Sequence, residues 1–365
     1  RAHGKNPGPI SHLEINNSDV FARLIREGDL GFCDAYLDGW WSTPDLQVFL
    51  DLVHADNDEM YDAFPGMGMV RAWEKFRFWL QSNSKSQAKK NISYHYDLGN
   101  DFYKLWLDET MTYSSAIFKT GQESTESAQI EKYSSLVDQM GAKEGDHILE
   151  IGCGWGGFAK YAAENDGVRV HGISISKEQV KYAKASCKGL NTSFELKDYR
   201  ELNTEYDSIV SIGMFEHVGY KNYKEYMEVA NRCLKDDGLF LLHTIGRNNS
   251  GRAADPWINK YIFPNGMTPS SKQISDAVED IFVVEDWHNF GQDYDATLMS
   301  WNENFQNSFN HLKDTYDERF KRMWEYYLLM CAGTFRARRN QLWQLVMSKG
   351  GIKGGYTYSN NPRFD

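Results

Sequence analysis

The chain has 365 residues, of which 41% are hydrophobic and 14% aromatic, so it has enough apolar material for a large core and an apolar pocket. Its formal charge of −11 argues against nucleic acid as a partner, because that binding depends on clustered Lys and Arg that neutralise phosphates. The 5 cysteines lie far apart without a C-x-x-C pair, which argues against a disulfide framework or a metal site and fits a reducing cytoplasm.

The N-terminal region has the pattern of a small helical domain. Residues 18–56 show helical apolar spacing, interrupted by Gly28, by Gly31 and by a turn from Ser42 to Pro44. Residues 71–90 then combine six basic residues with one acid and several aromatic residues. Such a segment suits either a helix that lies on an anionic membrane or a core helix followed by a solvated linker, and the sequence leaves both readings open. We expect an N-terminal lipid- or membrane-associated domain with this basic linker at residues 1–90 and a catalytic domain at 91–365.

From residue 146 onward, short β-rich runs alternate with helical segments. Seven runs read as strands, at 147–152, 169–175, 192–196, 206–213, 238–246, 282–290 and 342–349. A long helical stretch from about 296 to 339 separates the last two. This alternation predicts right-handed βαβ units and therefore an α/β fold with a parallel, doubly wound sheet.

The first of these strands leads into the glycine-rich loop "EIGCGWGG" at residues 150–157. Glycines at a strand-to-helix turn let backbone N–H groups approach a ligand, and both dinucleotide and S-adenosylmethionine sites use such turns. A nicotinamide site needs an acid after the second strand, where this chain has Ser174 and Ser176 instead. Glu150 lies where S-adenosylmethionine enzymes hold the methionine end, and Asp198, with Tyr199 beside it, follows the third strand in the place for adenine. S-adenosylmethionine is therefore the favoured cofactor, and a dehydrogenase is the alternative.

Polar residues also follow the fourth and fifth strands. Glu216 and His217 come after the fourth strand, and His243 and Ile245 lie at the end of the fifth. Because ligands sit outside the carboxyl ends of parallel strands, Glu216 and His243 can face one crevice beside the cofactor. We interpret His217 as a structural neighbour.

Long motifs now give a resemblance to a known family. They include "LIREGDLGFCDAYLDGWW" near the N-terminus, "HYDLGNDFYKLWLD" at 95–108, "LEIGCGWGGFAKYAAE" at 149–164, "MFEHVGYKNY" at 214–223 and "DPWINKYIFPNGMTPS" at 255–270. Over nearly its whole length the chain resembles the cyclopropane fatty acid synthases. The resemblance implies a Rossmann-like methyltransferase sheet of seven strands behind a small helical N-terminal domain.

The resemblance also implies the reaction. In this family, the alkene of a phospholipid acyl chain attacks the methyl of S-adenosylmethionine, and a bound bicarbonate is thought to remove the proton before ring closure. The positions that match the family's anion site are Glu216, His243, Ile245 through its backbone, and Tyr294. Ser115 stands where the family usually has a cysteine. If only the backbone N–H of this residue binds the anion, the exchange is nearly silent, which is the interpretation we favour; if the family's thiol takes part, the activity or the product changes.

The cofactor residues implied by the resemblance join those already discussed. Tyr113 and Ser114 match positions that contact the methionine moiety. The others that line the implied cofactor site are Gly152, Gly154, Ser174, Ile175, Gln179, Asp198 and Tyr199.

Several functional alternatives stay open on sequence alone. The nearest is a fatty-acid C-methyltransferase that leaves a methylated or branched chain without ring closure. A non-catalytic lipid-binding module is more distant. The partners we expect are phospholipid acyl chains and a second copy of the chain in a homodimer. Since there is no run long enough for a membrane span and no visible signal peptide, we expect a cytoplasmic protein held peripherally at the inner face of the cytoplasmic membrane.

Overall fold

The computed structural model describes residues 8–55, 98–251 and 255–357. The basic segment 71–90 and the expected domain boundary at residue 90 lie outside these ranges, so both remain predictions.

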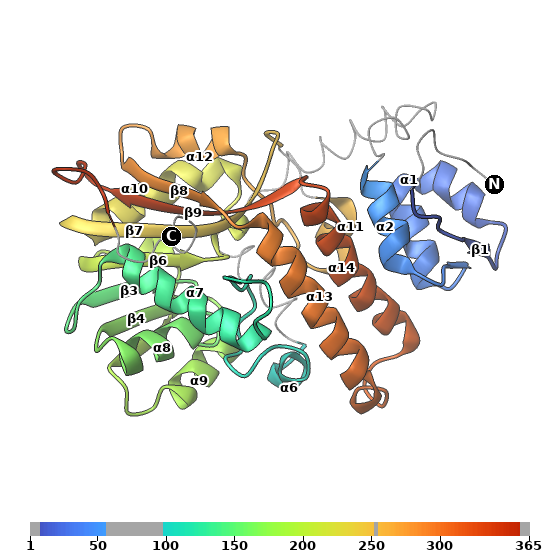
Figure 1. The fold of residues 1–365 in the computed structure, drawn as a ribbon, viewed down its shortest axis with the longest axis horizontal. Coiled ribbons are helices and arrows are strands. Elements are labelled where there is room, and N and C mark those ends of the chain that lie inside the picture. The colour runs from blue at the N-terminus through green and yellow to red at the C-terminus, as the bar shows by residue number, and fades with distance from the viewer. Residues whose placement is uncertain (1–7, 56–97, 252–254, 358–365) are drawn as a thin grey trace.

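A seven-stranded sheet forms the centre of the molecule (Figure 1). Its strands, in chain order, are β3 (His147–Ile151), β4 (Arg169–Ser174), β5 (Thr192–Leu196), β6 (Tyr206–Ile212), β7 (Leu234–Arg247), β8 (Val283–Asn289) and β9 (Asn340–Ser348). Their order across the sheet is β5-β4-β3-β6-β7-β9-β8. The predicted α/β fold with seven strands is confirmed. The strand positions follow from local β-rich runs, which is why they agree so closely.

One strand corrects the expectation of a parallel sheet. β9 runs antiparallel to both of its neighbours, β7 and β8. The connection from β8 consists of two packed helices, α13 (Gly291–Ser308) and α14 (Glu318–Arg336). A single crossover helix carries the chain from the carboxyl edge of a sheet back to its amino edge, so the next strand is parallel. Two antiparallel helices return the chain to the carboxyl edge, so the next strand must run in the opposite direction.

Helices cover both faces of the sheet. One apolar core joins the strands to α7 (Thr125–Met140), α8 (Gly157–Asn165) and α9 (Lys177–Ser186), and another joins them to α10 (Tyr223–Cys233) and α12 (Ser271–Val278). Local sequence sets the helix ends. The Ser124 side chain accepts a hydrogen bond from the Ser127 N–H at the start of α7, and Gly141 ends that helix at φ 57°.

The N-terminal helices α1 (Val20–Leu37) and α2 (Leu46–Ala55) lie beside α14, with α11 (Pro256–Tyr261) close by (Figure 1). The strand β1 (Glu14–Ile15), which precedes α1, pairs with β2 (Trp41–Ser42), which follows it, in a small two-stranded sheet. The short α6 (Asn100–Lys104) precedes α7. The predicted break at Gly28 is present as a kink with φ 64°, while Gly31 lies within the helix. A single apolar cluster runs from α1 and α2 into α13 and α14. This packing fixes α2 next to the carboxyl edge of the sheet.

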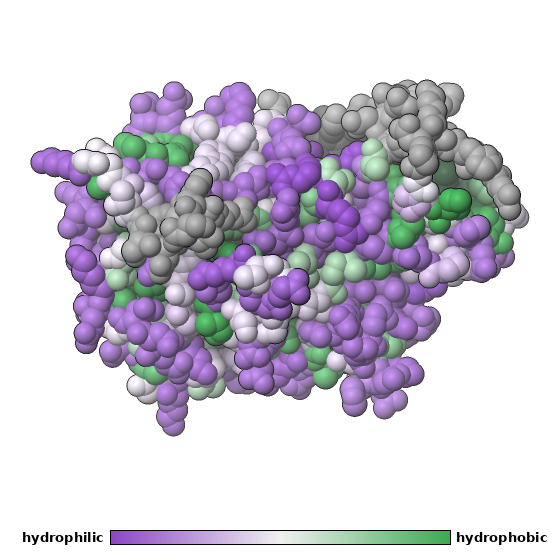
Figure 2. Space-filling view, viewed as in Figure 1, coloured by the Kyte–Doolittle hydropathy of each residue, from purple (hydrophilic) through white to green (hydrophobic). Residues whose placement is uncertain are grey.

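The visible face of the molecule is mostly hydrophilic, with apolar atoms gathered around the N-terminal helices (Figure 2). Exposed large apolar side chains among the first 25 residues are Ile10, Leu13, Ile15, Phe21 and Ile25. Within the ranges that the structure describes, no helix is long and apolar enough to cross a membrane.

Candidate active site

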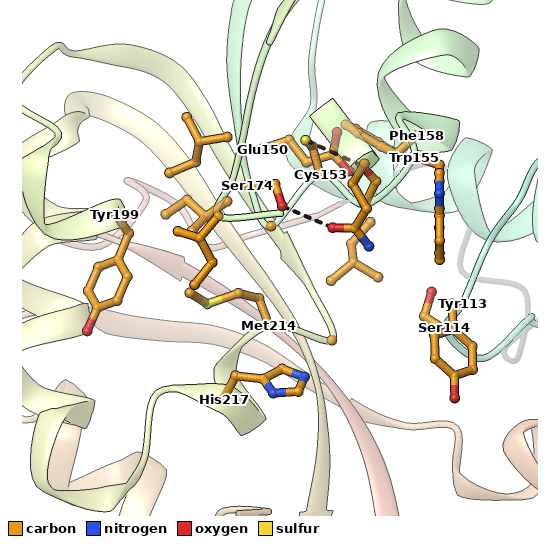
Figure 3. A pocket seen from close by; sticks show the side chains of 18 of the residues that line it. Tyr113, Ser114, Glu150, Cys153, Trp155, Phe158, Ser174, Tyr199, Met214 and His217 are labelled. Atoms are coloured by element: carbon orange, nitrogen blue, oxygen red, sulfur yellow. Dashed lines mark hydrogen bonds between the residues drawn. The ribbon is translucent and has the colours of Figure 1, made fainter. Parts of the chain in front are cut away.

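A pocket at the carboxyl edge of β3, β4 and β6 surrounds the glycine loop, and we call it the glycine-loop pocket (Figure 3). The residues predicted for the cofactor all line it, namely Tyr113, Ser114, Glu150, Gly152, Gly154, Ser174, Ile175, Gln179, Asp198 and Tyr199. Figure 3 shows Tyr199 on one side and Tyr113 with Ser114 on the other, with Glu150 and Ser174 between them. Residues from four separate segments of the chain therefore meet at one place.

Two glycines explain why this loop is open to a ligand. Gly152 has φ 87°, and an added Cβ would lie 2.7 Å from the Cβ of Met214. Gly154 has φ 51° and would meet nothing within 4 Å, so its backbone faces open space. Only glycine combines these dihedrals with such a close approach, which suits binding through backbone N–H groups.

Glu150 brings a buried carboxyl to the floor of this pocket. Its Oε2 atom is buried and has no hydrogen-bond partner among the described residues. Burial raises its pKa to about 8, and the nearby Lys132 opposes this shift. Such an orphaned carboxyl suits a cationic ligand group, because a positive charge would both hydrogen-bond it and lower its pKa. The pocket thus fits the amino end of S-adenosylmethionine.

Other polar groups line the middle of the pocket and the end that contains Tyr199. The Ser174 hydroxyl donates to the Gln179 Oε1 atom at 3.0 Å. Asp198 caps a short 3₁₀ turn and accepts from the Arg200 guanidinium at 2.7 and 2.6 Å. The Asp198 carboxylate is thereby held in a fixed orientation beside the buried Tyr199 ring.

A second cavity, which we call the deep cavity, adjoins the first and has a volume of about 450 Å³. Glu216, His243, Ile245 and Tyr294 all line it, and so does His217. Both cavities share Tyr113, Ser114, Gly213 and His217 as lining residues. The two cavities therefore adjoin at these four residues.

Glu216 connects two strand ends inside the deep cavity. It lies in a 3₁₀ turn after β6, and its Oε1 atom accepts the Ile245 N–H of β7 at 2.6 Å. Its Oε2 atom is buried without a partner among the described residues, and burial raises the pKa of the carboxyl to about 7. A carboxyl with this pKa can share a proton with an anion instead of repelling it. The Ile245 N–H that the sequence assigned to an anion is here taken by Glu216, because the two segments are in direct contact.

His243 supplies the second orphaned group. Its Nδ1 atom lies 3.1 Å from the side-chain amide nitrogen of Gln344 on β9, and its Nε2 atom is buried with no partner in the described residues. Burial holds the pKa of His243 well below its usual value, so the ring is neutral. With the Gln344 amide donating to Nδ1, the Nε2 atom carries the proton and can donate to a ligand. Glu216 and His243 together fit a small polar anion.

Ser115 does not join this group. Its side chain is fully buried, its hydroxyl donates to the Ala116 carbonyl at 2.9 Å, and it lines neither cavity. The Ala116 N–H is anchored in turn by the Thr297 hydroxyl of α13. The Ser115 side chain therefore points into packed protein.

Sequence reasoning missed several lining residues. Trp155 and Phe158 lie in the glycine-loop pocket, and Phe263, Tyr327 and Phe335 lie in the deep cavity. It also missed Lys132, whose fully buried Nζ donates to the Ser114 hydroxyl at 2.8 Å and to the Gln129 Oε1 atom at 2.7 Å. A lysine on an amphipathic helix gives no local sign of burial, so only packing could find it. Across the described ranges, no group of His, Cys, Asp and Glu could hold a metal ion.

Comparison with known proteins places this geometry in a family. The family model of mycolic acid cyclopropane synthetase matches residues 83–345. The chain is 46% identical over 355 residues to the cyclopropane-fatty-acyl-phospholipid synthase of Escherichia coli (strain K12), covering 94% of this chain and 90% of that protein. The chain belongs to the cyclopropane synthase family.

Other members and solved structures agree. The tuberculostearic acid methyltransferase UfaA1 of Mycobacterium tuberculosis is 33% identical over 93% of this chain and 83% of its own length. The structure of the cyclopropane synthase MmaA2 from Mycobacterium tuberculosis has a TM-score of 0.68 and 29% identity, covering 72% of this chain and 98% of that one. The cyclopropane synthase CmaA1, solved with SAH and CTAB, has a TM-score of 0.67 and 30% identity over the same shares.

Proposed function

We propose that the chain transfers the methyl group of S-adenosylmethionine to a cis double bond in a phospholipid acyl chain and closes a cyclopropane ring. A single observation carries this proposal: the glycine-loop pocket and the deep cavity share a wall made of Tyr113, Ser114, Gly213 and His217. A cofactor on one side can thus present its methyl group to an acyl chain on the other. We further propose the ten cofactor residues and the anion-site residues named above as the site of this reaction.

S-adenosylmethionine supplies an electrophilic methyl group when bound. The chain's own contribution is a cavity wall rich in aromatic rings, including Tyr113, Phe263 and Tyr294. Ring faces stabilise the positive charge that develops on the acyl chain, and a largely apolar lining keeps water away from it. The Tyr113 and Tyr327 hydroxyls lie 2.8 Å apart, which positions two of these rings.

We propose bicarbonate as the base that removes the proton before ring closure. The support is the pair of orphaned atoms in the deep cavity, Glu216 Oε2 and His243 Nε2. His243 would donate to the anion, and Glu216 would share a proton with it. Glu216 thus acts as a clamp, and the anion does the proton transfer.

We also propose that the chain works at a membrane surface and forms a homodimer. The exposed apolar side chains near the N-terminus, such as Phe21 and Ile25, support contact with a membrane surface or with a second copy in a homodimer. An N-terminal domain ending near residue 90, a cytoplasmic location and peripheral attachment to the inner membrane face remain parts of this proposal.

Mass spectrometry of lipids from cells that express the chain tests the function. Ring closure adds one CH₂ and removes the double bond. A product that gains CH₂ but keeps a double bond would instead indicate the fatty-acid C-methyltransferase; the 36% identical relative from Pseudomonas putida is named a probable fatty acid methyltransferase.

The variant Glu216→Gln tests the clamp in the same assay. Because an amide N–H is a far weaker acid than a protonated carboxyl and forms a weaker hydrogen bond to an anion, we expect ring formation to fall at least about tenfold while S-adenosylmethionine affinity, measured by calorimetry, is unchanged. Unchanged lipid modification would remove Glu216 from this role.

A further inference from the structure

A third cavity opens next to the deep cavity, at the carboxyl edge of β7, and has a volume of about 630 Å³. We call it the arginine pocket, because four of the residues that line it are Arg247, Arg336, Arg338 and Arg339. It shares His54, Arg247 and Arg339 with the deep cavity. The two cavities therefore lie side by side at these residues.

The arginine pocket is lined by more basic than acidic residues, whereas the whole chain has a net charge of −11. Arg336 is neutralised by Asp51 and Asp295, at 2.5 and 2.7 Å. Arg247, Arg338 and Arg339 form no ion pair with a carboxylate within the described part of the chain. Asp51 is the one acidic residue among the described residues that line the pocket. Asp255 in the deep cavity lies close enough to Arg247 for the arginine charge to lower its pKa. The arginines still outnumber the acidic residues here, and this excess of cationic side chains in a chain of net charge −11 suits an anionic ligand.

Arg338 has a backbone conformation that glycine adopts more readily than other residues. It follows the end of α14 with φ 57°, in the left-handed region. Glycine would adopt this conformation without steric cost. The presence of a long cationic side chain at this point indicates that its charge serves a purpose other than ending the helix.

The strand β7 fixes the distance between the arginine pocket and the part of the deep cavity that holds Glu216 and His243. His243, Ile245 and Arg247 alternate along one strand and all line the deep cavity, so they point to the same face. Four residues of extended strand span about 13 Å. The lining of the deep cavity also includes apolar side chains such as Ile258, Leu298 and Met330. A ligand that fills this space has a charged end near Arg247 and an apolar body reaching toward His243.

We propose that Arg247, Arg338 and Arg339 bind the phosphate of the phospholipid headgroup whose acyl chain fills the deep cavity. The inference rests on the proposed function and adds to it a site for the polar end of the substrate. It explains how one substrate places a mid-chain double bond at Glu216 and His243: the bound phosphate sets how far the chain enters.

The test compares two substrates presented in the same neutral-detergent micelles. Unsaturated phosphatidylcholine has no net charge but carries the phosphate, whereas unsaturated diacylglycerol lacks it. The variants are Arg338→Gly, which also relieves the backbone, and Arg247→Gln. The matched control is Arg26→Gln, which removes an arginine whose side chain is 70% exposed on α1.

We expect both pocket variants to lower kcat/KM for phosphatidylcholine about tenfold to a hundredfold and to leave that for diacylglycerol within about twofold. Arg338→Gly keeps or raises the Tm, which separates this loss from unfolding. Equal losses on both substrates, or an unchanged preference for phosphatidylcholine, would overturn the proposal. The control keeps the wild-type preference.

Two further measurements complete the test. One distinguishes a headgroup phosphate from free phosphate, and the other measures lipid binding without requiring that the lipid react. Inorganic phosphate that inhibits both substrates equally would indicate a site for the free ion and overturn the headgroup assignment, while inhibition of phosphatidylcholine alone supports it. Saturated phosphatidylcholine has no double bond to react, and its binding can be measured by tryptophan fluorescence. This measurement compares the variants with the control without turnover. A chain that binds this lipid through the arginines but forms no methylated product would contradict the proposed function and not the headgroup site.

Discussion

At the residue scale, the Glu216 carboxyl decides how an anion can be held in the deep cavity. Its pKa near 7 arises from burial, which outweighs the hydrogen bond from the Ile245 N–H. Below that pH the protonated carboxyl donates to an anion, and above it the carboxylate repels one.

This pKa predicts a pH dependence for bicarbonate. The KM for bicarbonate, expressed as the concentration of the bicarbonate ion at each pH, should rise above pH 7 by up to about tenfold per pH unit, since one group ionises. The residual activity of Glu216→Gln should lack this rise, because the amide does not titrate. Steady-state kinetics between pH 6 and 9 measure both profiles, and the same rise in the variant would contradict the assignment.

Lys132 is a positioning residue for the shared wall between the two cavities. Its buried Nζ holds the Ser114 hydroxyl and the Gln129 side chain, whose amide in turn donates to the Ser114 carbonyl at 2.8 Å. Burial lowers its pKa to about 7, and the carboxyls of Asp108 and Glu150 oppose this shift. Lys132 is thus linked to the floor of the glycine-loop pocket as well as to its wall.

We predict that Lys132→Met weakens S-adenosylmethionine binding about tenfold, since Ser114 loses a charge-assisted hydrogen bond and Glu150 loses a nearby cation. The KM for the lipid should change little. Calorimetry measures the affinity, and Lys160→Met, at an exposed position of α8, is the control. A variant that binds the cofactor normally would show that Lys132 serves stability alone.

At the element scale, α14 holds the N-terminal helices against the catalytic sheet. Arg322 of α14 donates to the Tyr36 and Trp41 carbonyls at 2.7 and 2.9 Å, and its guanidinium lies 4.0 Å from the centroid of the Tyr36 ring. The planar fork of arginine makes all three contacts at once, which a lysine ammonium cannot do.

Arg322→Lys should therefore lower the free energy of unfolding by about 1–3 kcal/mol. Urea denaturation measures this change, and limited proteolysis should show earlier cleavage near α1 and α2. The control Arg26→Lys, at an exposed position on α1, should leave both unchanged. A stable Arg322→Lys variant would indicate that the apolar cluster alone holds the helices.

The elements themselves were largely predictable. All seven strands lie within a few residues of their predicted bounds, because β-rich runs between turns are local patterns. The direction of β9 was not predictable from its own residues. It depends on α13 and α14 folding back on each other, which is a contact between elements.

At the scale of the whole molecule, the charge of −11 should repel an anionic membrane, so any contact must be local. The basic segment 71–90 lies outside the described residues and remains the predicted contact. Exchange of Lys85, Lys89 and Lys90 for Glu should weaken binding to anionic liposomes, measured by sedimentation. The matched control is the same exchange at Lys160, Lys184 and Lys188, which are exposed on α8, on α9 and just beyond α9. Equal weakening by both triple variants would indicate a general charge effect.

The sequence by itself determined the order of the strands along the chain, the glycine loop and the polar residues at the strand ends that line the two cavities. These follow from backbone preferences and from motifs at strand ends, which act over a few residues. The tertiary structure alone decided which atoms meet. In the folded chain the Ile245 N–H donates to Glu216, and the Ser115 side chain lies in the core, where its hydroxyl donates to the Ala116 carbonyl. The buried Lys132 donates to the Ser114 hydroxyl. It also joined α2, β7 and the end of α14 into the arginine pocket, because contacts between distant segments depend on how whole elements pack.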